Sequence, residues 1–352
     1  MARFVIKRLL AGFLVIWGIV TLLFLIFNVL GNPAESMTDE NTDEATRLAI
    51  EKAYHLDQST FVQYLWYLND LSPIGALDRS DPDLEAQSYT SLFGLGGSTF
   101  IALKTPWLRR SFQSNRKVTT MISEKLPGTA ILAISSMFLA VLLGIPLGVI
   151  SALKKGKWGD RLITFVTLLG ISAPSFFVAV VIIRIFSVSL GDVTGLPITG
   201  YLFEKNIFDD GYTIHWGNLI LPTLALGIRP LSIITQLTRS SMMEVLTSEY
   251  VRTARAKGLS SRVVLFKHAL RNALNPVITS ISGWFASLLA GAFFIETIFD
   301  WQGLGKLTID ALSTKDYPVI LGAAILIGVI FVSINILVDI LYTRLDPRVR
   351  LR

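Results

Sequence analysis

The sequence contains no cysteine and only three histidines, and these absences exclude several kinds of site. Without thiols the chain forms no disulfide, no thiolate metal site and no cysteine nucleophile. His55, His215 and His268 are far apart in the sequence and have no metal-ligand spacing, which argues against a structural metal centre. No His-Glu-x-x-His pattern occurs, so an intramembrane metalloprotease has no support.

Charged residues are also scarce. They make up 16% of the 352 residues, against roughly 25% in an ordinary soluble domain. Hydrophobic residues make up 52%, and the mean hydropathy is +0.56. The net charge of +6 is spread between apolar stretches rather than gathered on one face, which argues against nucleic acid as a partner. The composition predicts an all-α polytopic membrane protein.

About six apolar stretches approach the roughly 20 residues that a membrane-spanning helix requires. The first follows a basic start and resembles a signal peptide, but it is longer than the roughly 7–15 apolar residues of such a peptide. We therefore expect it to be a retained span. The predicted spans are Leu9–Leu30, Ala130–Ala152, Leu162–Leu190, Leu219–Leu237, Val277–Phe299 and Val319–Tyr342.

The distribution of Lys and Arg predicts the orientation, because cytoplasmic loops near span ends collect positive charge. With the N-terminus inside, every segment on that side is rich in Lys and Arg, and we expect both termini in the cytoplasm. The loops near 191–217 and 300–318 are mainly acidic. The predicted cytoplasmic segments are Met1–Arg8, Lys154–Arg161, Arg239–Arg271 and Arg344–Arg352.

The same pattern predicts four parts of the chain. Residues 1–31 hold the cytoplasmic start and first helix, 32–117 form an extracytoplasmic region, 118–342 form a five-helix core, and 343–352 form a cytoplasmic tail. We expect short helices in the outer region, which includes an amphipathic piece at Phe61–Leu68, and a small added lobe from an insertion. Its role as a structural cap or as a docking surface stays open.

Helix-breaking and charged residues occur within the predicted spans. Small residues and proline, as in Gly144-Ile-Pro146, favour close helix packing, and kinks at Pro174 and Pro230 are candidates for shaping a translocation path. Arg229, near the middle of its stretch, is a candidate for lining that path or meeting a substrate carboxylate.

Three other charged residues have simpler explanations. Arg184 and Glu296 are expected to snorkel to the membrane interface, because both lie towards the outer ends of their stretches. Asp339 is expected to face neighbouring helices or the cytoplasmic end.

The most informative segment is the cytoplasmic loop at 243–276. It runs Ser248-Glu-Tyr-Val-Arg-Thr-Ala-Arg-Ala-Lys-Gly-Leu-Ser260 and predicts a helix over Glu249–Lys257. Gly258 can adopt the left-handed conformation that ends a helix, and Ser260 or Ser261 can cap a second helix. That second helix should end before Pro276, where the next span is expected to begin. Composition alone would allow only a solvated basic loop.

The order of residues in this loop resembles the transmembrane subunits of ABC importers, whose loop has the form Glu-Ala-Ala, three residues, Gly. With His268-Ala-Leu-Arg-Asn-Ala-Leu274 it resembles the dipeptide, oligopeptide and nickel permease family more narrowly. Further matching segments occur in the expected order. They are Gly31–Ala34, Leu126–Thr129, Gly144–Gly148, Leu237–Ser241, Glu296–Phe299, Gly303–Gly305, Asp316–Pro318 and Leu345–Arg348.

Two features depart from the family pattern. Gln302 stands where the family has proline, and residues 72–107 resemble an insertion. Neither lies in the loop.

The resemblance implies a type I ABC importer permease fold in the bacterial plasma (inner) membrane. The implied partners are two ATPase subunits, a second homologous permease subunit and an extracytoplasmic solute-binding protein. The loop would dock on an ATPase subunit: Glu249 and Arg255 would make polar contacts, Ala254 and Ala256 would allow close approach, and Gly258 would permit the turn. The remaining residues assigned to this coupling loop are Tyr250, Arg252, Thr253, Lys257 and Leu259.

The chain itself has no convincing nucleotide site. Gly303-Leu-Gly-Lys-Leu-Thr308 lacks the leading Gly and the hydroxyl residue after Lys that a phosphate-binding loop needs. We therefore expect a non-catalytic subunit without a bound cofactor, with ATP and Mg²⁺ on the partner subunits. Peptides are the expected solutes and nickel the alternative. An ion-coupled secondary transporter is less consistent, because the chain has no internal repeat and few intramembrane acidic residues.

Overall fold

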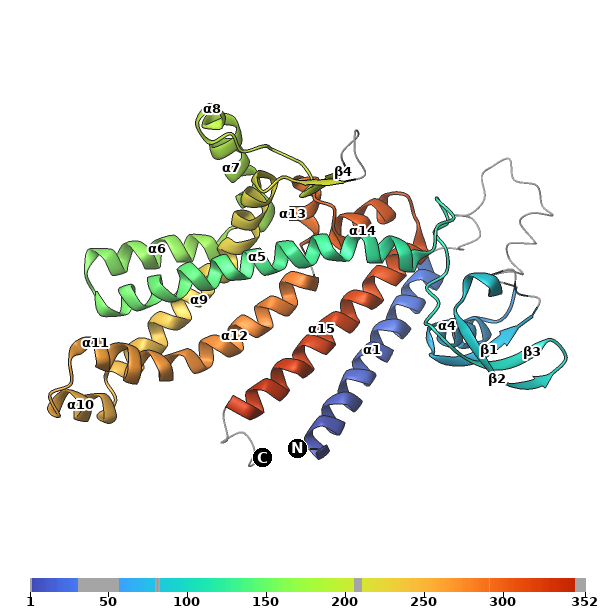
Figure 1. Cartoon of the computed structure of the whole chain (residues 1–352), viewed down its shortest axis with the longest axis horizontal. Coiled ribbons are helices and arrows are strands. Elements are labelled where there is room, and N and C mark those ends of the chain that lie inside the picture. The colour runs from blue at the N-terminus through green and yellow to red at the C-terminus, as the bar shows by residue number, and fades with distance from the viewer. Residues whose placement is uncertain are drawn as a thin grey trace. The chain divides into compact units, whose positions relative to one another are not determined.

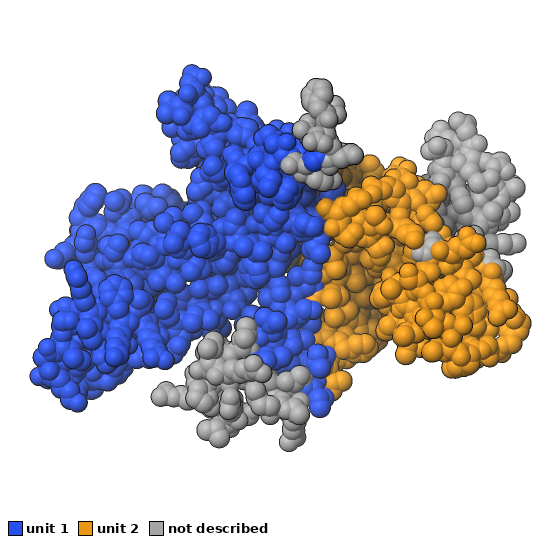
Figure 2. All heavy atoms as spheres, in the orientation of Figure 1, with its two compact units in different colours: residues 1–9, 125–306, 330–352 blue, residues 10–124, 307–329 orange. Residues whose placement is uncertain are grey.

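The computed structural model describes residues 2–30, 57–79, 81, 83–205, 211–290 and 292–345. Several residues named above lie outside them, namely Gly31–Ala34, His55 and the tail after Leu345, as does the side chain of Asp339. The chain divides into two compact units (Figure 2). Unit 1 comprises residues 1–9, 125–306 and 330–352, and unit 2 comprises residues 10–124 and 307–329.

Unit 1 is built almost wholly from helices. Figure 1 labels most of them along the green, yellow and orange parts of the chain. They are most of α5 (Val118–Leu153), α6 (Trp158–Ser172), α7 (Ser175–Ile182), α8 (Gly191–Thr194), α9 (Gly217–Leu246), α10 (Glu249–Ala256), α11 (Ser261–Val263), α12 (Arg271–Ala290), α13 (Phe293–Ile298) and the end of α15 (Tyr317–Leu345). Two π-helical segments, η2 (Ile183–Ser189) and η3 (Val264–Leu270), and a short pair of strands, β4 (Phe203–Lys205) and β5 (Tyr212–Ile214), complete it.

Small residues allow α9 to pack closely against α5 and α6. A Cβ added to Gly148 would lie 2.6 Å from the Thr235 carbonyl oxygen, and one added to Gly170 would lie 2.2 Å from the Ser232 hydroxyl. Within a bilayer, helices associate through such close van der Waals contact rather than through the hydrophobic effect. Gly144, for which packing was predicted, also lies close to α9, since an added Cβ would be 3.0 Å from the Leu231 carbonyl oxygen.

The predicted span Leu162–Leu190 is wrong as a single helix. The structure has α6, a break at Ala173–Pro174, and then α7 continuing into η2, with a bend of 113° between the two halves. Pro174 has no amide hydrogen to continue the helix, and proline disfavours helical backbone in the residue before it. Ala173 accordingly has extended backbone, with φ −72° and ψ 133°.

The described residues also contain fewer candidate spans than the roughly six that were predicted. Four helices in the described ranges are long and apolar enough to cross a membrane, or up to five if the bent pair counts as one span. The predicted span Val277–Phe299 is divided between α12, which ends at Ala290, and α13. Pro276 does not begin that span, because α12 starts five residues earlier at Arg271 and continues through it.

Unit 2 contains most of α1 (Ala2–Leu30), then α4 (Thr60–Leu71), the first turns of α5 and α15, and most of α14 (Leu304–Ser313). It also holds a sheet that the all-α prediction missed. The strands β1 (Ile74–Asp78), β2 (Tyr89–Gly96) and β3 (Thr99–Lys104) are antiparallel in the order β1-β3-β2, with the short helix η1 (Leu84–Ala86) before β2.

Local sequence explains the hairpin of β2 and β3. Gly96 and Gly97 have φ angles of +108° and +64°, which glycine adopts readily at the tight connection. In β3 the alternate residues Phe100 and Ala102 are buried, as the period of two in a half-covered strand requires. The sheet occupies much of the predicted insertion at 72–107, where short helices were expected.

Candidate functional site

The loop at 243–276 folds as a helix, a turn and a second helical segment. The N-cap of α10 is Ser248, the helix ends at Ala256, and Gly258 has a φ of +79°. Ser260 is the N-cap of α11, which continues through η3 into α12. The predicted break at Gly258 is confirmed. Of the two serines predicted as caps, Ser260 takes the N-cap position, but its side chain makes no capping hydrogen bond. In Figure 1, α10 and α11 lie at one end of α9 and α12.

The inner face of α10 is apolar and buried. Val251 is fully buried and Ala254 is 6% exposed, and both pack against Val264 of η3, with Val245 of α9 beside them. These residues are three apart in the sequence, so they lie on the same face of the helix. This packing fixes α10 to the segments that lead into α9 and α12.

The outer face of α10 is polar and exposed. Glu249 and Arg252 form an ion pair of 3.5 Å, but their side chains are more than 80% exposed, so the pair adds little stability. Arg255 and Lys257 are also exposed, as are Thr253, Ala256 and Leu259. This face therefore has three cations and one carboxylate, which gives it a local excess of positive charge.

One of the predicted contact residues differs from the expectation. Ala254 faces the interior of its own unit, so it cannot offer close approach to a partner, whereas Ala256 is exposed. Tyr250 is partly exposed and its hydroxyl accepts a hydrogen bond from Asn272 Nδ2 at 3.0 Å, which connects α10 to α12. Sequence reasoning missed Val251, Val264 and Asn272, although the spacing of Val251 and Ala254 signals a buried face.

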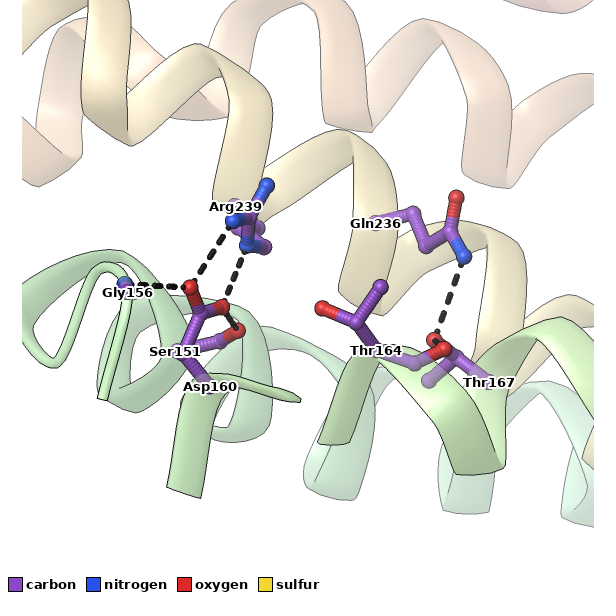
Figure 3. Close-up of polar contacts among 7 residues, drawn as sticks. All are labelled: Ser151, Gly156, Asp160, Thr164, Thr167, Gln236 and Arg239. Atoms are coloured by element: carbon purple, nitrogen blue, oxygen red, sulfur yellow. Dashed lines mark hydrogen bonds and ion pairs between the residues drawn. The ribbon is translucent and has the colours of Figure 1, made fainter. Parts of the chain in front are cut away.

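A partly buried ion pair connects α9 to α6 and the end of α5. Asp160 is 3% exposed and accepts from Arg239 Nε at 2.6 Å and Nη2 at 2.9 Å (Figure 3). Ser151 Oγ and the amide of Gly156 also donate to the Asp160 carboxylate, at 2.6 and 2.8 Å. A bidentate pair whose carboxylate oxygens also accept further hydrogen bonds holds its helices in one geometry.

A second polar contact joins the same two helices further along. Gln236 Nε2 donates to Thr167 Oγ1 at 3.2 Å, and Thr167 Oγ1 donates to the Thr164 carbonyl oxygen at 3.0 Å (Figure 3). Together with the Asp160 ion pair, this contact holds α6 against α9, the helix that leads into the loop.

The predicted path residues lie near one cavity of about 130 Å³. Arg229 and Pro230 line it, and the guanidinium carbon of Arg229 lies 5.8 Å from the centre of the Trp284 ring, within cation–π range. Pro174 does not line the cavity, but its neighbours Ala173 and Ser175 do. Pro230 lies within α9, which continues through it as one helix.

Glu296 does not snorkel, because it is fully buried. Its carboxylate accepts from Thr129 Oγ1 at 2.7 Å and from the Lys306 amide at 3.0 Å. Thr129 Oγ1 in turn accepts from the Leu304 amide at 2.8 Å. A Cβ on Gly303 would lie 2.3 Å from the Glu296 carboxyl carbon, so the turn closes around this side chain.

The Gly303–Thr308 segment thus uses its amides for a carboxylate of the same chain. Glu296 fills the space beside Gly303 and Gly305 that a phosphate would need. Residues of three matched segments, Thr129, Glu296 and Gly303, therefore form one cluster, which we call the Glu296 cluster. Its geometry is that of a structural connection between α5, α13 and α14.

Comparison of the sequence with known proteins identifies its family. The family described as binding-protein-dependent transport system inner membrane component matches residues 144–351. The dipeptide transport system permease protein DppB of Bacillus subtilis is 37% identical over 352 residues, covering 100% of this chain and 99% of the relative. DppB of Alkalihalophilus pseudofirmus is 34% identical over 364 residues, covering 99% of this chain and 100% of the relative. The oligopeptide transport system permease protein AppB of Bacillus subtilis is 35% identical over 350 residues, covering 99% of both chains.

These matches extend over both units and include the loop at 243–276. With the apolar helices they establish a multi-pass inner-membrane protein of the type I ABC importer permease fold. The chain belongs to the family of inner-membrane components of binding-protein-dependent transport systems.

Proposed function

We propose that this chain is one of two permease subunits of an ATP-driven peptide importer, and that its loop at 243–276 docks on a cytoplasmic ATPase subunit. The full assembly would contain two ATPase subunits, a second homologous permease subunit and an extracytoplasmic solute-binding protein. ATP and Mg²⁺ would bind to the ATPase subunits, so this chain would contribute no catalysis. Both termini and the loop would lie in the cytoplasm, as the distribution of Lys and Arg predicts.

The observation that carries this proposal is the two-faced structure of α10. Its buried face, Val251 and Ala254, packs on the segments leading to α9 and α12, while its charged face is exposed. A loop that only collected positive charge would not need a buried face. A helix of this kind suits a docking element that meets a partner and passes displacement to the helices behind it.

Physical coupling requires that the two states of the ATPase pair make different contacts with α10. Displacement of α10 would then act on α9 through Val245 and on α12 through Tyr250 and Asn272. The Asp160–Arg239 pair would carry it from α9 to α6 and α5. Rigid contacts of this sort allow a closure in one subunit to bias the arrangement of helices in another.

The substrate class is proposed from the named relatives together with the cavity at Arg229. The relatives are named for dipeptides and oligopeptides, which favours peptides over nickel. A peptide carries a carboxylate, which an arginine side chain can bind through two parallel hydrogen bonds. We assign Arg229 to this contact, with Trp284 holding its guanidinium and Pro230 and Pro174 shaping the path.

The test is nucleotide hydrolysis and uptake in reconstituted vesicles that contain this chain, the partner permease, the ATPase subunits and the binding protein. Dipeptides, tripeptides and nickel are supplied in separate reactions. The charge reversal Arg255→Glu should uncouple hydrolysis from uptake, whereas the matched control Lys155→Glu, an exposed cation outside α10, should not. Uptake driven by an ion gradient without any ATPase subunit would contradict the proposal.

The substrate assignment has its own control. Arg229→Met should reduce uptake of free peptides more than uptake of peptides with an amidated C-terminus, because only the former carry that carboxylate. Equal reduction for both would remove Arg229 from substrate recognition while leaving the coupling loop untouched.

A further inference from the structure

Helix α4 of unit 2 has an inverted distribution of polar and apolar side chains. Its outward residues Phe61 and Leu65 are 68% and 48% exposed, and they are four residues apart on one face. Two polar residues near its C-terminal end, Asn69 and Asp70, are partly buried and have partners. Asn69 exchanges two hydrogen bonds with the backbone of Ala76, at 2.7 and 2.8 Å, and Asp70 is paired with Arg109 at 2.9 Å.

The depth of α4 follows from its contact with α1. The hydroxyls of Tyr64 and Thr21 are 2.6 Å apart, and Phe24 contacts the rings of Tyr64 and Tyr67. Thr21 lies six residues inside the Phe27 end of the candidate span Ile6–Phe27. At a rise of 1.5 Å per residue, that is about 9 Å within the span. The contact between α1 and α4 therefore lies within the apolar length of α1, at a depth where exposed Phe61 and Leu65 would meet lipid rather than water.

A cavity of about 90 Å³ lies on the inner side of α4. Its lining is mostly apolar and includes Phe24 and Phe27 of α1, Tyr67 and Leu71 of α4, and Leu321 and Ile325 of α15. Gln63, Arg109 and Tyr317 also line it, so the cavity has an apolar part and a polar part, as an amphipathic ligand requires. Since α1 and α15 both contribute candidate spans, the hydrocarbon of the membrane would reach the cavity.

One polar group in the cavity lining has no assigned partner. The hydroxyl of Tyr67 is buried and makes no hydrogen bond among the described residues. An unsatisfied buried hydroxyl is costly, so a donor in this position suits a ligand that brings an acceptor oxygen. The ester carbonyl of a phospholipid lies beside its acyl chain and provides such an acceptor.

We propose that α4 is a membrane-interfacial helix and that the cavity behind it binds a phospholipid, with an acyl chain against the aromatic lining and an ester oxygen accepting from Tyr67. The site lies at the Phe27 end of α1, so it would be in the outer leaflet under the proposed orientation. Binding of lipid at this site does not depend on which solute the chain transports.

The first experiment measures the depth of α4. Because the chain has no native cysteine, Phe61→Cys can be labelled with a nitroxide in nanodiscs of phosphatidylethanolamine and phosphatidylglycerol. The label should collide with oxygen more often, and with a water-soluble nickel chelate less often, than a label at Glu85→Cys, an exposed residue of η1. Equal access of the nickel chelate to both labels would overturn the proposal. A label shielded from both reagents in the assembled importer would also overturn it, because a protein partner would then cover α4.

The second experiment tests the cavity with a phospholipid that carries a photoreactive group in its acyl chain. Adducts should map to α4 and to residues 317–325. Tyr67→Phe should lower their yield about fivefold, the effect of losing one hydrogen bond of about 1 kcal/mol. The control Tyr89→Phe, on the exposed strand β2, should leave the yield unchanged.

Folding of the variant is checked separately. In lipid-free detergent Tyr67→Phe should be as stable as the wild type or more stable, since it removes an unsatisfied hydroxyl. Unchanged adduct yield in a folded Tyr67→Phe variant, or adducts confined to the outward face of α1, would contradict the assigned site.

Discussion

The loop at 243–276 and the Glu296 cluster both connect helices of unit 1, and both depend on glycine, but for opposite reasons. Gly258 has a φ of +79° and open space around its Cα, so it is required for backbone conformation. Gly303 and Gly128 have ordinary φ angles, but added Cβ atoms would lie 2.3 Å from the Glu296 carboxyl carbon and 1.8 Å from the Gln302 carbonyl oxygen. Glycine is required at these two positions because a side-chain carbon would overlap the neighbouring atoms.

The charged residues of the loop and of the Glu296 cluster also differ in their exposure. In the loop, Glu249, Arg252, Arg255 and Lys257 are exposed on one face of α10. In the cluster, Glu296 is fully buried and bound by Thr129 and the Lys306 amide. An exposed charged face on a packed helix is suited to meeting a partner, whereas a buried, satisfied carboxylate is suited to holding helices together. Substitutions in the two regions should therefore have different consequences.

The largest effect on stability is expected for Gly128→Ala. Its Cβ would meet the backbone carbonyl of Gln302 at 1.8 Å, so α5 and the turn after α13 must separate. We expect a loss of about 3 kcal/mol or more in the free energy of unfolding, at the upper end for overpacking. Thermal unfolding in detergent measures it. Gly18→Ala, with open space in α1, is the control and should not lower the unfolding temperature.

A similar loss is expected for Glu296→Ala. The substitution leaves the Lys306 amide and the Thr129 hydroxyl without their buried acceptor, at about 1–3 kcal/mol for each unsatisfied group. Glu296→Gln keeps one side-chain carbonyl oxygen as an acceptor, so its loss of stability should be smaller. If both variants unfolded at the wild-type temperature, the cluster would not be the structural connection described above.

Gly258 should affect coupling more than stability. A β-branched residue with φ near +79° costs about 1–2 kcal/mol or more, so Gly258→Val should reposition α10. Ligand-stimulated hydrolysis should fall about tenfold, as a bias of that size implies. Gly258→Asn should retain more activity, because asparagine tolerates this conformation better. Gly195→Val, at another left-handed glycine with open space, should leave the stimulation intact.

The smallest effect is a pH dependence at Asp300. Donation from Lys306 and Tyr201 holds the pKa of the Asp300 carboxyl below its ordinary value. Its stabilising contribution is therefore complete above the unfolded pKa of about 3.9 and is lost as the pH falls through the lower folded pKa. The group is partly exposed, so the contribution should stay below about 1 kcal/mol. Lys306→Met should flatten the acid limb of unfolding temperature against pH, whereas Lys315→Met should not.

Sequence was sufficient where a residue type determines its own backbone conformation. Gly258, Ser260 and Pro174 each marked a boundary or break that the structure contains. The order of residues in the loop also indicated the family. In contrast, sequence did not give the size of the bend at Pro174, because the angle depends on what α6 and α7 pack against.

Partners distant in the sequence were the main source of error. Glu296 was expected at the membrane interface, and its actual partner Thr129 lies 167 residues away. Ala254 was expected on the docking face, but Val264 covers it after the turn at Gly258. The sheet of unit 2 was missed although Gly96 and Gly97 favour a hairpin. The region was expected to contain short helices and a small added lobe, to which no strands were assigned.

The central claim, that the exposed face of α10 docks on an ATPase subunit, is tested most directly by cross-linking from single cysteines in a chain that has none of its own. Ala256→Cys and Ala254→Cys make the same small change on opposite faces of α10. In active reconstituted importer, a short thiol-reactive photo-cross-linker at Ala256→Cys should join this chain to the ATPase subunit, and the same reagent at Ala254→Cys should not. Equal yields at both positions, or no cross-link from Ala256→Cys in an importer that still couples hydrolysis to uptake, would contradict the account.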